Sequence, residues 1–148
     1  KVIRKHRLWE VFLVEKLKFG WDEIHEIAEQ LEHIKSPKLI DKLDAHLGFP
    51  KKDPHGDPIP DKNGLFPTIK KLKLNELKIG EKAILTGVSE DSKDFLSYLD
   101  TIGLKLGSSI EVLDYFKFDK SLKVKINNRS DLTFSDLVAN NLNISKEN

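Results

Sequence analysis

The segment "FPKKDPHGDPIPDKNGLFPT", Phe49 to Thr68, divides the chain into two parts with different residue patterns. It contains five of the six prolines in the 148-residue sequence. Because proline has no backbone N–H and a fixed φ, this segment cannot form a helix or a central strand. At about 20 residues it is also longer than most loops inside a domain. We therefore interpret it as a connector at a domain boundary.

The residues before the connector have the apolar periodicity of helices. The pattern predicts three helices, which begin near Val2, after the capping residue Asp22, and at the cap and first-turn proline Ser36-Pro37. The first and third helices are expected to stop at Gly20 and Gly48, because glycine suits the left-handed conformation that often follows a helix.

The residues after the connector alternate between apolar and polar, which is typical of strands. The predicted strands are "KAILTGV", "SSIEVLDYF", "SLKVKI" and, after a turn, "LTFS". Between the first two, "SKDFLSYLDTIG" predicts a short helix that stops at Gly103. Several short strands and one helix indicate a small SH3-like β-barrel. The predicted fold class is α+β: an all-α domain of about three helices with its connector over residues 1–64, then the barrel over residues 65–148.

Composition and charge exclude several classes of protein. Lys and Arg number 25 against 24 acidic residues, so the net charge of +1 gives no electrostatic reason for this chain to bind a nucleic acid or a membrane surface. There is no cysteine, which excludes disulfides and thiolate metal sites. No apolar run approaches the roughly 20 residues of a membrane span. We expect a cytoplasmic protein, and, because the sequence starts without methionine inside a helical pattern, a further segment before it.

A histidine and a carboxylate share an apolar stripe on the first predicted helix. At about 100° per residue, His6 and Glu10 fall among the apolar side chains of that helix. A carboxylate in such a place costs several kcal/mol unless a cation, a metal or strong donors compensate it. Two interpretations remain open: a structural hydrogen-bonded pair, or a metal-binding or catalytic pair.

The second predicted helix carries four potential metal ligands within an arc of about 100°. They are His25, Glu29, Glu32 and His33. Such a face is more often simply solvated, but imidazole and carboxylate groups one and two turns apart can also chelate a divalent metal. His55 lies among turn-forming residues in "DPHGDPIP", and we interpret its role as structural.

Three motifs in this order and spacing resemble the diphtheria-toxin-repressor (DtxR) family of metal-dependent bacterial transcriptional regulators, whose manganese branch is the MntR-like proteins. They are "RKHRLWE", "IHEIAEQLEH" and "DPHGDPIP". The later stretch "FLSYLDTIGLKLGSSIEVLDY" resembles the FeoA-type barrel that ends many longer members. The resemblance covers nearly the whole chain. It implies a metal-binding and dimerisation domain followed by a FeoA-type domain, without the winged helix-turn-helix that opens the family's members.

The resemblance also implies two neighbouring metal sites. The implied ligands are His6, Glu10 and His25 with Glu90 from the barrel in the first site, and Glu29, Glu32 and His33 in the second, activating site. Iron-type members have cysteine at the position of Glu29, so the glutamate favours manganese, whereas a histidine at the position of His25 is more typical of iron-type members. The expected cofactor is therefore a divalent ion, manganese(II) or iron(II), with zinc and cobalt as alternatives.

The implied function is that of the metal-binding and dimerisation portion of a metal-dependent repressor. Metal occupancy would control operator binding by the intact homodimer, which would contact DNA only through the missing N-terminal domain; no enzymatic activity and no membrane partner are expected. The residues leave two alternatives open. One is a small metallohydrolase that uses His6, Glu10 and His25 around an activated water, and the other is a metal-free adaptor whose barrel binds another protein.

Overall fold

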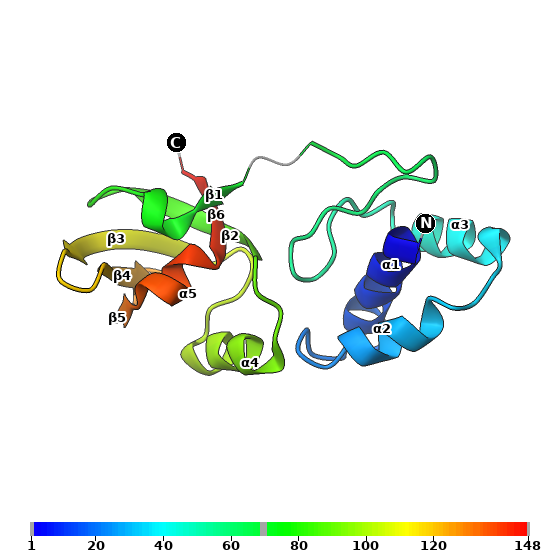
Figure 1. The fold of residues 1–148 in the computed structure, drawn as a ribbon, viewed down its shortest axis with the longest axis horizontal. Coiled ribbons are helices and arrows are strands. Elements are labelled where there is room, and N and C mark those ends of the chain that lie inside the picture. Colours follow the sequence, from blue (N-terminus) through cyan, green and yellow to red (C-terminus); the bar gives the residue numbers. More distant parts are fainter. Residues whose placement is uncertain (1, 69–70, 148) are drawn as a thin grey trace. The chain divides into compact units, whose positions relative to one another are not determined.

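The structure is a computed structural model that describes residues 2–68 and 71–147 and divides into two compact units, residues 1–69 and 70–148 (Figure 1). The first unit is helical, and the second is built on an antiparallel sheet. The predicted α+β fold class, with three helices ahead of a small β domain, is confirmed. No helix among the described residues is long and apolar enough to cross a membrane.

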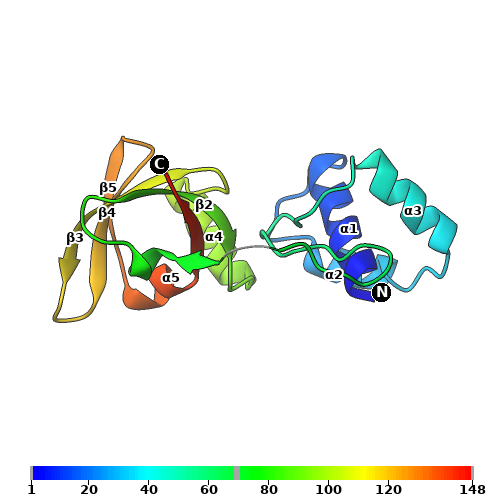
Figure 2. The same cartoon turned by 90° about the horizontal axis from the view of Figure 1, so that it is seen from above.

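The helical unit consists of three helices and the connector that follows them. The helices are α1 (Val2–Glu15), α2 (His25–Leu31) and α3 (Pro37–His46). Helix α1 packs against both of the others (Figure 2). Its buried face supplies much of the core, which comprises Leu8, Trp9, Val11, Leu13, Ile24, Ala28, Ile40, Leu43 and Ile59. Ile59 belongs to the connector, so part of that segment is packed onto the helices.

The loop between α1 and α2 differs from the prediction at both ends. The left-handed residue after α1 is Lys18, with φ 63°, so the stop predicted at Gly20 is wrong. The N-cap residue of α2 is Ile24, which makes no side-chain capping bond, so the cap predicted at Asp22 is also wrong. The physical reason is that Glu23 closes the loop, because its carboxylate accepts a hydrogen bond of 2.7 Å from the backbone N–H of Gly20.

The start of α3 is as predicted. The Ser36 hydroxyl accepts a hydrogen bond of 3.2 Å from the backbone N–H of Leu39, and Pro37 is the first residue of the helix. Gly48, just after the helix, has φ 79°, a conformation that glycine adopts without a steric penalty. These residues fix both ends of α3 by local chemistry alone.

Replacing Ser36 by alanine is expected to lower the free energy of unfolding of the helical unit by about 1 kcal/mol, because an N–H of the first turn loses its acceptor. Urea denaturation followed by far-ultraviolet circular dichroism measures the change. The Ser36→Thr variant retains a hydroxyl at the cap and should keep most of the stability. An alanine variant as stable as the unaltered protein would show that this cap contributes nothing.

The connector forms no helix and no strand, as predicted, and contains only an isolated bridge between Lys52 and Pro58. Its central turn is organised by Asp53, whose carboxylate oxygen Oδ1 accepts hydrogen bonds of 2.9 Å from the backbone N–H groups of His55 and Asp57. The Arg7 guanidinium on α1 donates to the carbonyl of Pro58. The turn that contains "DPHGDPIP" is therefore held against α1.

The second unit is a six-stranded antiparallel sheet with strand order β1-β6-β2-β3-β4-β5. Its elements are β1 (Leu72–Lys73), the 3₁₀ helix η1 (Leu74–Glu76), β2 (Lys82–Val88), α4 (Lys93–Ile102), β3 (Ser109–Phe116), β4 (Ser121–Ile126), β5 (Ser130–Phe134), α5 (Asp136–Asn140) and β6 (Leu142–Lys146). Irregularities in register lie between Leu85 and Gly87 in β2 and between Val112 and Asp114 in β3.

Four predicted strands and one predicted helix of this unit are confirmed. Helix α4 is capped at its start by Ser92, whose hydroxyl accepts from the N–H of Phe95, and at its end by Gly103, with φ 79°. Strand β6 was not predicted, although it lies inside the sheet between β1 and β2. Its sequence includes a polar residue, Asn143, that is nonetheless buried and bonded to the Ser89 hydroxyl.

Candidate metal centre

Glu10 is a carboxylate in the core of the helical unit. It lies on the buried face of α1 between Trp9 and Val11, and only 2% of its surface is exposed. A buried carboxylate requires compensating charge or strong hydrogen-bond donors. The placement of Glu10 inside the apolar stripe of the first helix, expected from its position in the sequence, is therefore found in the structure, and its neighbours determine its chemistry.

His6 lies one turn before Glu10 and contacts two carboxylates. Its Nε2 is 3.2 Å from Oε2 of Glu10, and its Nδ1 is 2.5 Å from Oε1 of Glu32 on the following helix segment. The hydrogen bond to Glu10 raises the pKa of His6 to about 9, with burial opposing this and the bond to Glu32 adding to it. At neutral pH the His6 ring is consequently an imidazolium that links α1 to the end of α2.

His25, the first residue of α2, completes a group of potential ligands with His6 and Glu10. Its Nδ1 is 4.0 Å from Oε2 of Glu10, and its ring centroid is 4.9 Å from that of His6. One ligand atom from each of the three residues lies within 4.8 Å of the others. The His25 side chain is 61% exposed, and a cavity of about 270 Å³ opens onto it. The three helical-unit ligands that the family resemblance implies for the first site are thus close together.

The remaining predicted ligands are placed differently. Glu32 bonds to His6, while Glu29 and His33 are exposed on and just after α2. Within residues 2–68 and 71–147, these three do not form a group of ligand atoms of their own. Glu90 is an exposed residue of the second unit, in the segment between β2 and α4.

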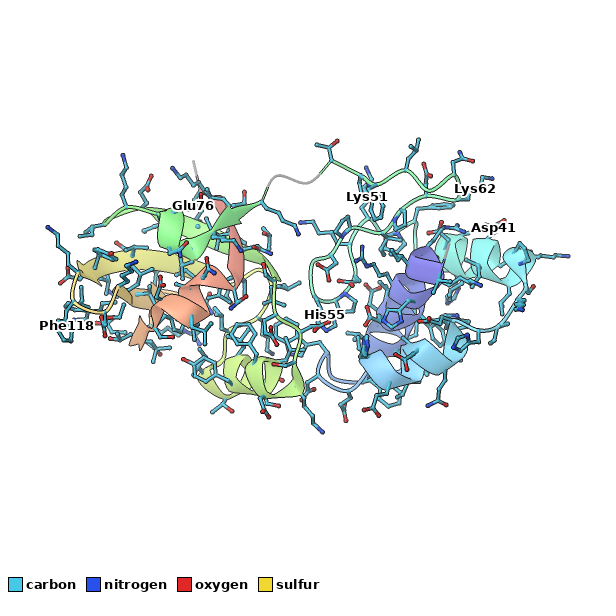
Figure 3. The ribbon with its side chains drawn as sticks, in the orientation of Figure 1. Asp41, Lys51, His55, Lys62, Glu76 and Phe118 are labelled. Carbon is cyan, nitrogen blue, oxygen red and sulfur yellow. The ribbon has the colours of Figure 1, made fainter. Side chains whose placement is uncertain are left out.

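A second group of potential ligands also contains Glu10, and sequence reasoning missed it. Its other members are Asp53 and His55 of the connector, and one ligand atom from each of the three lies within 4.8 Å of the others. Glu10 and His55 are each 2% exposed and Asp53 is 5% exposed. The sequence signal was present, because "DPHGDPIP" is one of the three motifs that carried the family resemblance, but it gave no indication that the connector brings His55 close to Glu10. Figure 3 labels His55 on the connector.

The pKa values of Asp53 and Glu10, the two acidic residues of this buried group, are shifted in opposite directions. Burial, followed by the charges of Asp57 and Glu10, raises the pKa of Asp53 to about 8. Burial also acts to raise the pKa of Glu10, but the hydrogen bonds from His6 and Asp53 outweigh it and hold the pKa below its usual range. At neutral pH, therefore, Glu10 is ionised and Asp53 retains its proton, so the pair shares one negative charge.

The donor set of the buried group fits a divalent cation. Two carboxylates and an imidazole, without sulfur, are ligands for manganese(II), iron(II), cobalt(II) or zinc(II). The His6 imidazolium compensates Glu10, whereas the Arg7 guanidinium, with its Nε 4.0 Å from Oδ2 of Asp53, compensates Asp53 only weakly. The pair has too little positive charge around it for both carboxyl groups to ionise, and a cation would supply that charge.

Comparison with known protein families accounts for both units. Residues 1–61 match the family described as "Iron dependent repressor, metal binding and dimerisation domain", and residues 72–146 match the FeoA domain family. Both units thus match domains of a regulator family, and neither match is to a catalytic family.

Curated relatives match part of the chain. It is 43% identical over 60 residues to a "Probable metal transport system membrane protein" of Chlamydia trachomatis and 41% identical over 59 residues to the iron-dependent repressor IdeR of Mycobacterium tuberculosis. Each match covers 40% of this chain, but only 13% of the chlamydial protein and 26% of IdeR. The chain therefore spans a small part of the length of these relatives.

Solved structures match almost the entire chain. A manganese-dependent transcriptional repressor in complex with manganese is 35% identical to this chain, with a TM-score of 0.90. The match covers 99% of this chain and 69% of that repressor. A second manganese-dependent transcriptional repressor is 36% identical with a TM-score of 0.91 and is covered over 79% of its length. The ScaR repressor with bound Cd²⁺ is 38% identical with a TM-score of 0.85. The chain belongs to the DtxR family of metal-dependent repressors, and it comprises that family's metal-binding and dimerisation domain followed by a FeoA domain.

Proposed function

We propose that this chain is the metal-sensing and dimerising portion of a manganese- or iron-dependent DNA-binding repressor. The observation that carries the proposal is the buried carboxylate of Glu10, which belongs to both groups of ligand atoms found among the described residues. A cation that binds one conformation of the intact protein more tightly than another shifts the population towards it. Through this linkage, metal occupancy controls operator binding by a DNA-binding domain outside this chain.

We place the cation first at Glu10, Asp53 and His55. All three side chains are buried, which protects the ligands from water, and the connector turn holds Asp53 and His55 in fixed backbone positions. His6 and Asp53 must each lose a proton before they can ligate a cation. His6 and His25 form the adjoining group, which shares Glu10, so the two groups are not independent.

The other residues implied by the family resemblance remain part of the proposal. Glu90 would complete the first site from the FeoA domain. Glu29, Glu32 and His33 would form the activating site, with further ligands from the DNA-binding domain. Occupation of that site requires Glu32 to release His6, to which it is bonded in this structure. Breaking the hydrogen bond between His6 and Glu32 therefore opposes metal binding at the activating site.

Calorimetric titration with manganese(II) tests the placement of the cation. His55→Gln is expected to weaken manganese binding by about 10- to 100-fold, because it removes a buried ligand from a set of three. His25→Gln should have a smaller effect, since that side chain is 61% exposed. The matched control is His46→Gln, at an exposed position on α3. A greater loss in the His25 variant would place the cation at His6, Glu10 and His25 instead.

The chain is expected to form a homodimer, as the description of the matched family implies. Sedimentation equilibrium should give about 34 kDa, twice the 17.0 kDa of one chain, as expected for a two-fold dimer. Large apolar side chains exposed on the helical unit are available for such an interface, among them Ile3, Leu17, Ile34 and Leu39. A mass of one chain over the micromolar range would contradict this expectation.

A second candidate function is favoured by the 43% identity to the chlamydial metal transport system membrane protein. In this case the same metal-binding unit would serve as the metal-responsive part of a transport system. An antibody raised against this chain distinguishes the two candidates in the cells that produce it. A product in the membrane fraction supports the transport role, and a product that co-precipitates with chromosomal DNA supports the repressor.

A further inference from the structure

The connector contains the one Asn-Gly pair of the sequence, Asn63 and Gly64. Both residues are exposed, and Figure 3 labels Lys62, which precedes them. Within the described part of the chain, Asn63 bonds through its backbone N–H, and its side-chain amide has no hydrogen-bond partner. No contact therefore holds this amide away from the backbone that follows it.

An asparagine followed by glycine can lose its side-chain amide without an enzyme, and asparagine is accordingly a thermolabile residue. The backbone nitrogen of Gly64 would attack the side-chain carbonyl carbon of Asn63, so that a new C–N bond forms. The bond from that carbon to Nδ2 breaks, and ammonia leaves with the proton that the Gly64 nitrogen gives up. Water then opens the five-membered imide at either carbonyl, which leaves aspartate or isoaspartate.

Gly64 leaves the reacting atoms accessible. Glycine has no Cβ to obstruct the approach of its nitrogen to the asparagine side chain. Its φ is 82°, and a Cβ built on it would meet no heavy atom within 4 Å. The glycine is therefore required by the backbone conformation and not by a close neighbour. The open space around it also admits the water that the second step consumes.

A turn closed by Asp61 holds the attacking nitrogen in place. The N–H of Gly64 donates to the Asp61 carbonyl at 2.9 Å, and the N–H of Asp61 donates to the Leu65 carbonyl at 2.9 Å. The carboxylate oxygen Oδ1 of Asp61 accepts from the N–H groups of Asn63 at 2.9 Å and Leu65 at 3.0 Å. Aspartate at the first position and glycine at the fourth are typical of a type I turn. Because the Gly64 nitrogen must leave its hydrogen bond before it can attack, this turn opposes the reaction.

We propose that Asn63 is a site of spontaneous deamidation and that the turn closed by Asp61 governs its rate. Isoaspartate carries the main chain through the former side chain, which inserts a methylene group into the backbone ahead of Gly64. The Gly64 N–H then no longer meets the Asp61 carbonyl, so the turn cannot close again. With age, a chain acquires a permanent negative charge and an open turn in its connector. This inference is independent of the proposed function.

The test follows the loss of Asn63 in the full chain during incubation in mildly alkaline buffer. Chromatography and mass spectrometry of the proteolytic peptides resolve asparagine, aspartate and isoaspartate. Asn63 should convert faster than Asn128, an exposed turn residue followed by Arg129. Asp61→Ala should accelerate the conversion by about 5-fold, because two backbone N–H groups lose their acceptor. Asp61→Asn keeps an acceptor oxygen and should stay close to the unaltered rate.

Incubation in urea separates the effect of the turn from the reactivity of the Asn-Gly pair. The unfolded chain has no turn, so the unaltered protein should convert faster than when folded, and Asp61→Ala should no longer differ from it. The comparison of folded with unfolded unaltered protein decides the matter even where the alanine variant is unstable. Equal rates in the two states would show that the turn does not govern the reaction. A folded chain in which Asn63 is no more reactive than Asn128 would overturn the site itself.

Discussion

Replacing Glu10 by glutamine is expected to reduce manganese(II) affinity by at least about 100-fold, the largest loss for any single substitution in this chain. Glu10 belongs to both groups of ligand atoms, so its loss cannot be compensated by moving the cation from one group to the other. Glutamine has the same shape but no charge, and a neutral amide is a much weaker ligand for a hard divalent cation than a carboxylate. The measurement is a calorimetric titration of both proteins at the same pH.

The matched control for this prediction is Glu15→Gln, which removes an exposed charge from the same helix. That variant should bind manganese(II) as the unaltered protein does. Circular dichroism verifies that the Glu10 variant is folded, since glutamine occupies the same volume in the core. If the folded Glu10→Gln variant keeps its affinity within about 3-fold, Glu10 is a structural partner of His6 and the proposed site is wrong.

The metal-free protein is expected to lose stability as the pH rises from 6 to 9. Burial raises the pKa of Asp53 from 3.8 to about 8, so between these values the folded state holds a proton that the unfolded state has released. This contribution to stability is largest at low pH and is lost as the pH approaches 8. The hydrogen bond to Glu10 raises the pKa of His6 from 6.5 to about 9, and its contribution is likewise lost as the pH rises through 9.

The titrations of Asp53 and His6 both lower the stability of the folded protein as the pH rises from 6 to 9. Asp53 alone accounts for roughly 1 kcal/mol per pH unit between pH 6 and 8. For a unit of this size the melting temperature should fall by about 10 °C. The measurement is a set of thermal melts with a chelator present. Excess manganese(II) should cancel the fall, because carboxylates must lose their protons to ligate and metal affinity therefore increases with pH.

Asp53→Asn isolates the contribution of Asp53 to this pH dependence. The amide is neutral at every pH, like the protonated carboxyl group that it replaces, so the stability of the variant should depend on pH less steeply, with only the contribution of His6 left. Asp61→Asn, at an exposed position of the same connector, should retain the full dependence. A constant melting temperature in the unaltered, metal-free protein from pH 6 to 9 would show that the buried carboxyl pair does not share a proton.

Local sequence chemistry determined most of the elements of the fold. Ser36 and Gly103 act within three or four residues of themselves, so their roles at helix ends could be read from the sequence. The loop after α1 was predicted incorrectly because Glu23 reaches back to Gly20, and nothing in the pattern favours that bond over a cap at Asp22. Strand β6 was missed because its burial depends on the neighbouring strands β1 and β2 and not on its own composition.

The candidate site shows the same division between local and distant contacts. Helical periodicity alone identified Glu10 as a buried carboxylate beside His6. Asp53 and His55 reach Glu10 from more than 40 residues away, through a turn whose position depends on the burial of Ile59 and on the bond from Arg7. Periodicity carries no information about such a contact, and so the second group of ligands could be found only in three dimensions.

The aromatic residues give the two units separate optical signals. Both tryptophans, Trp9 and Trp21, lie in the helical unit, and both tyrosines, Tyr98 and Tyr115, lie in the FeoA unit. Excitation at the red edge of the absorption band, where tyrosine does not absorb, therefore monitors the helical unit alone, and one of its two fluorophores is stacked on His55. The unlabelled chain thus contains a natural fluorescent reporter for the half that holds the candidate ligands Glu10, Asp53 and His55.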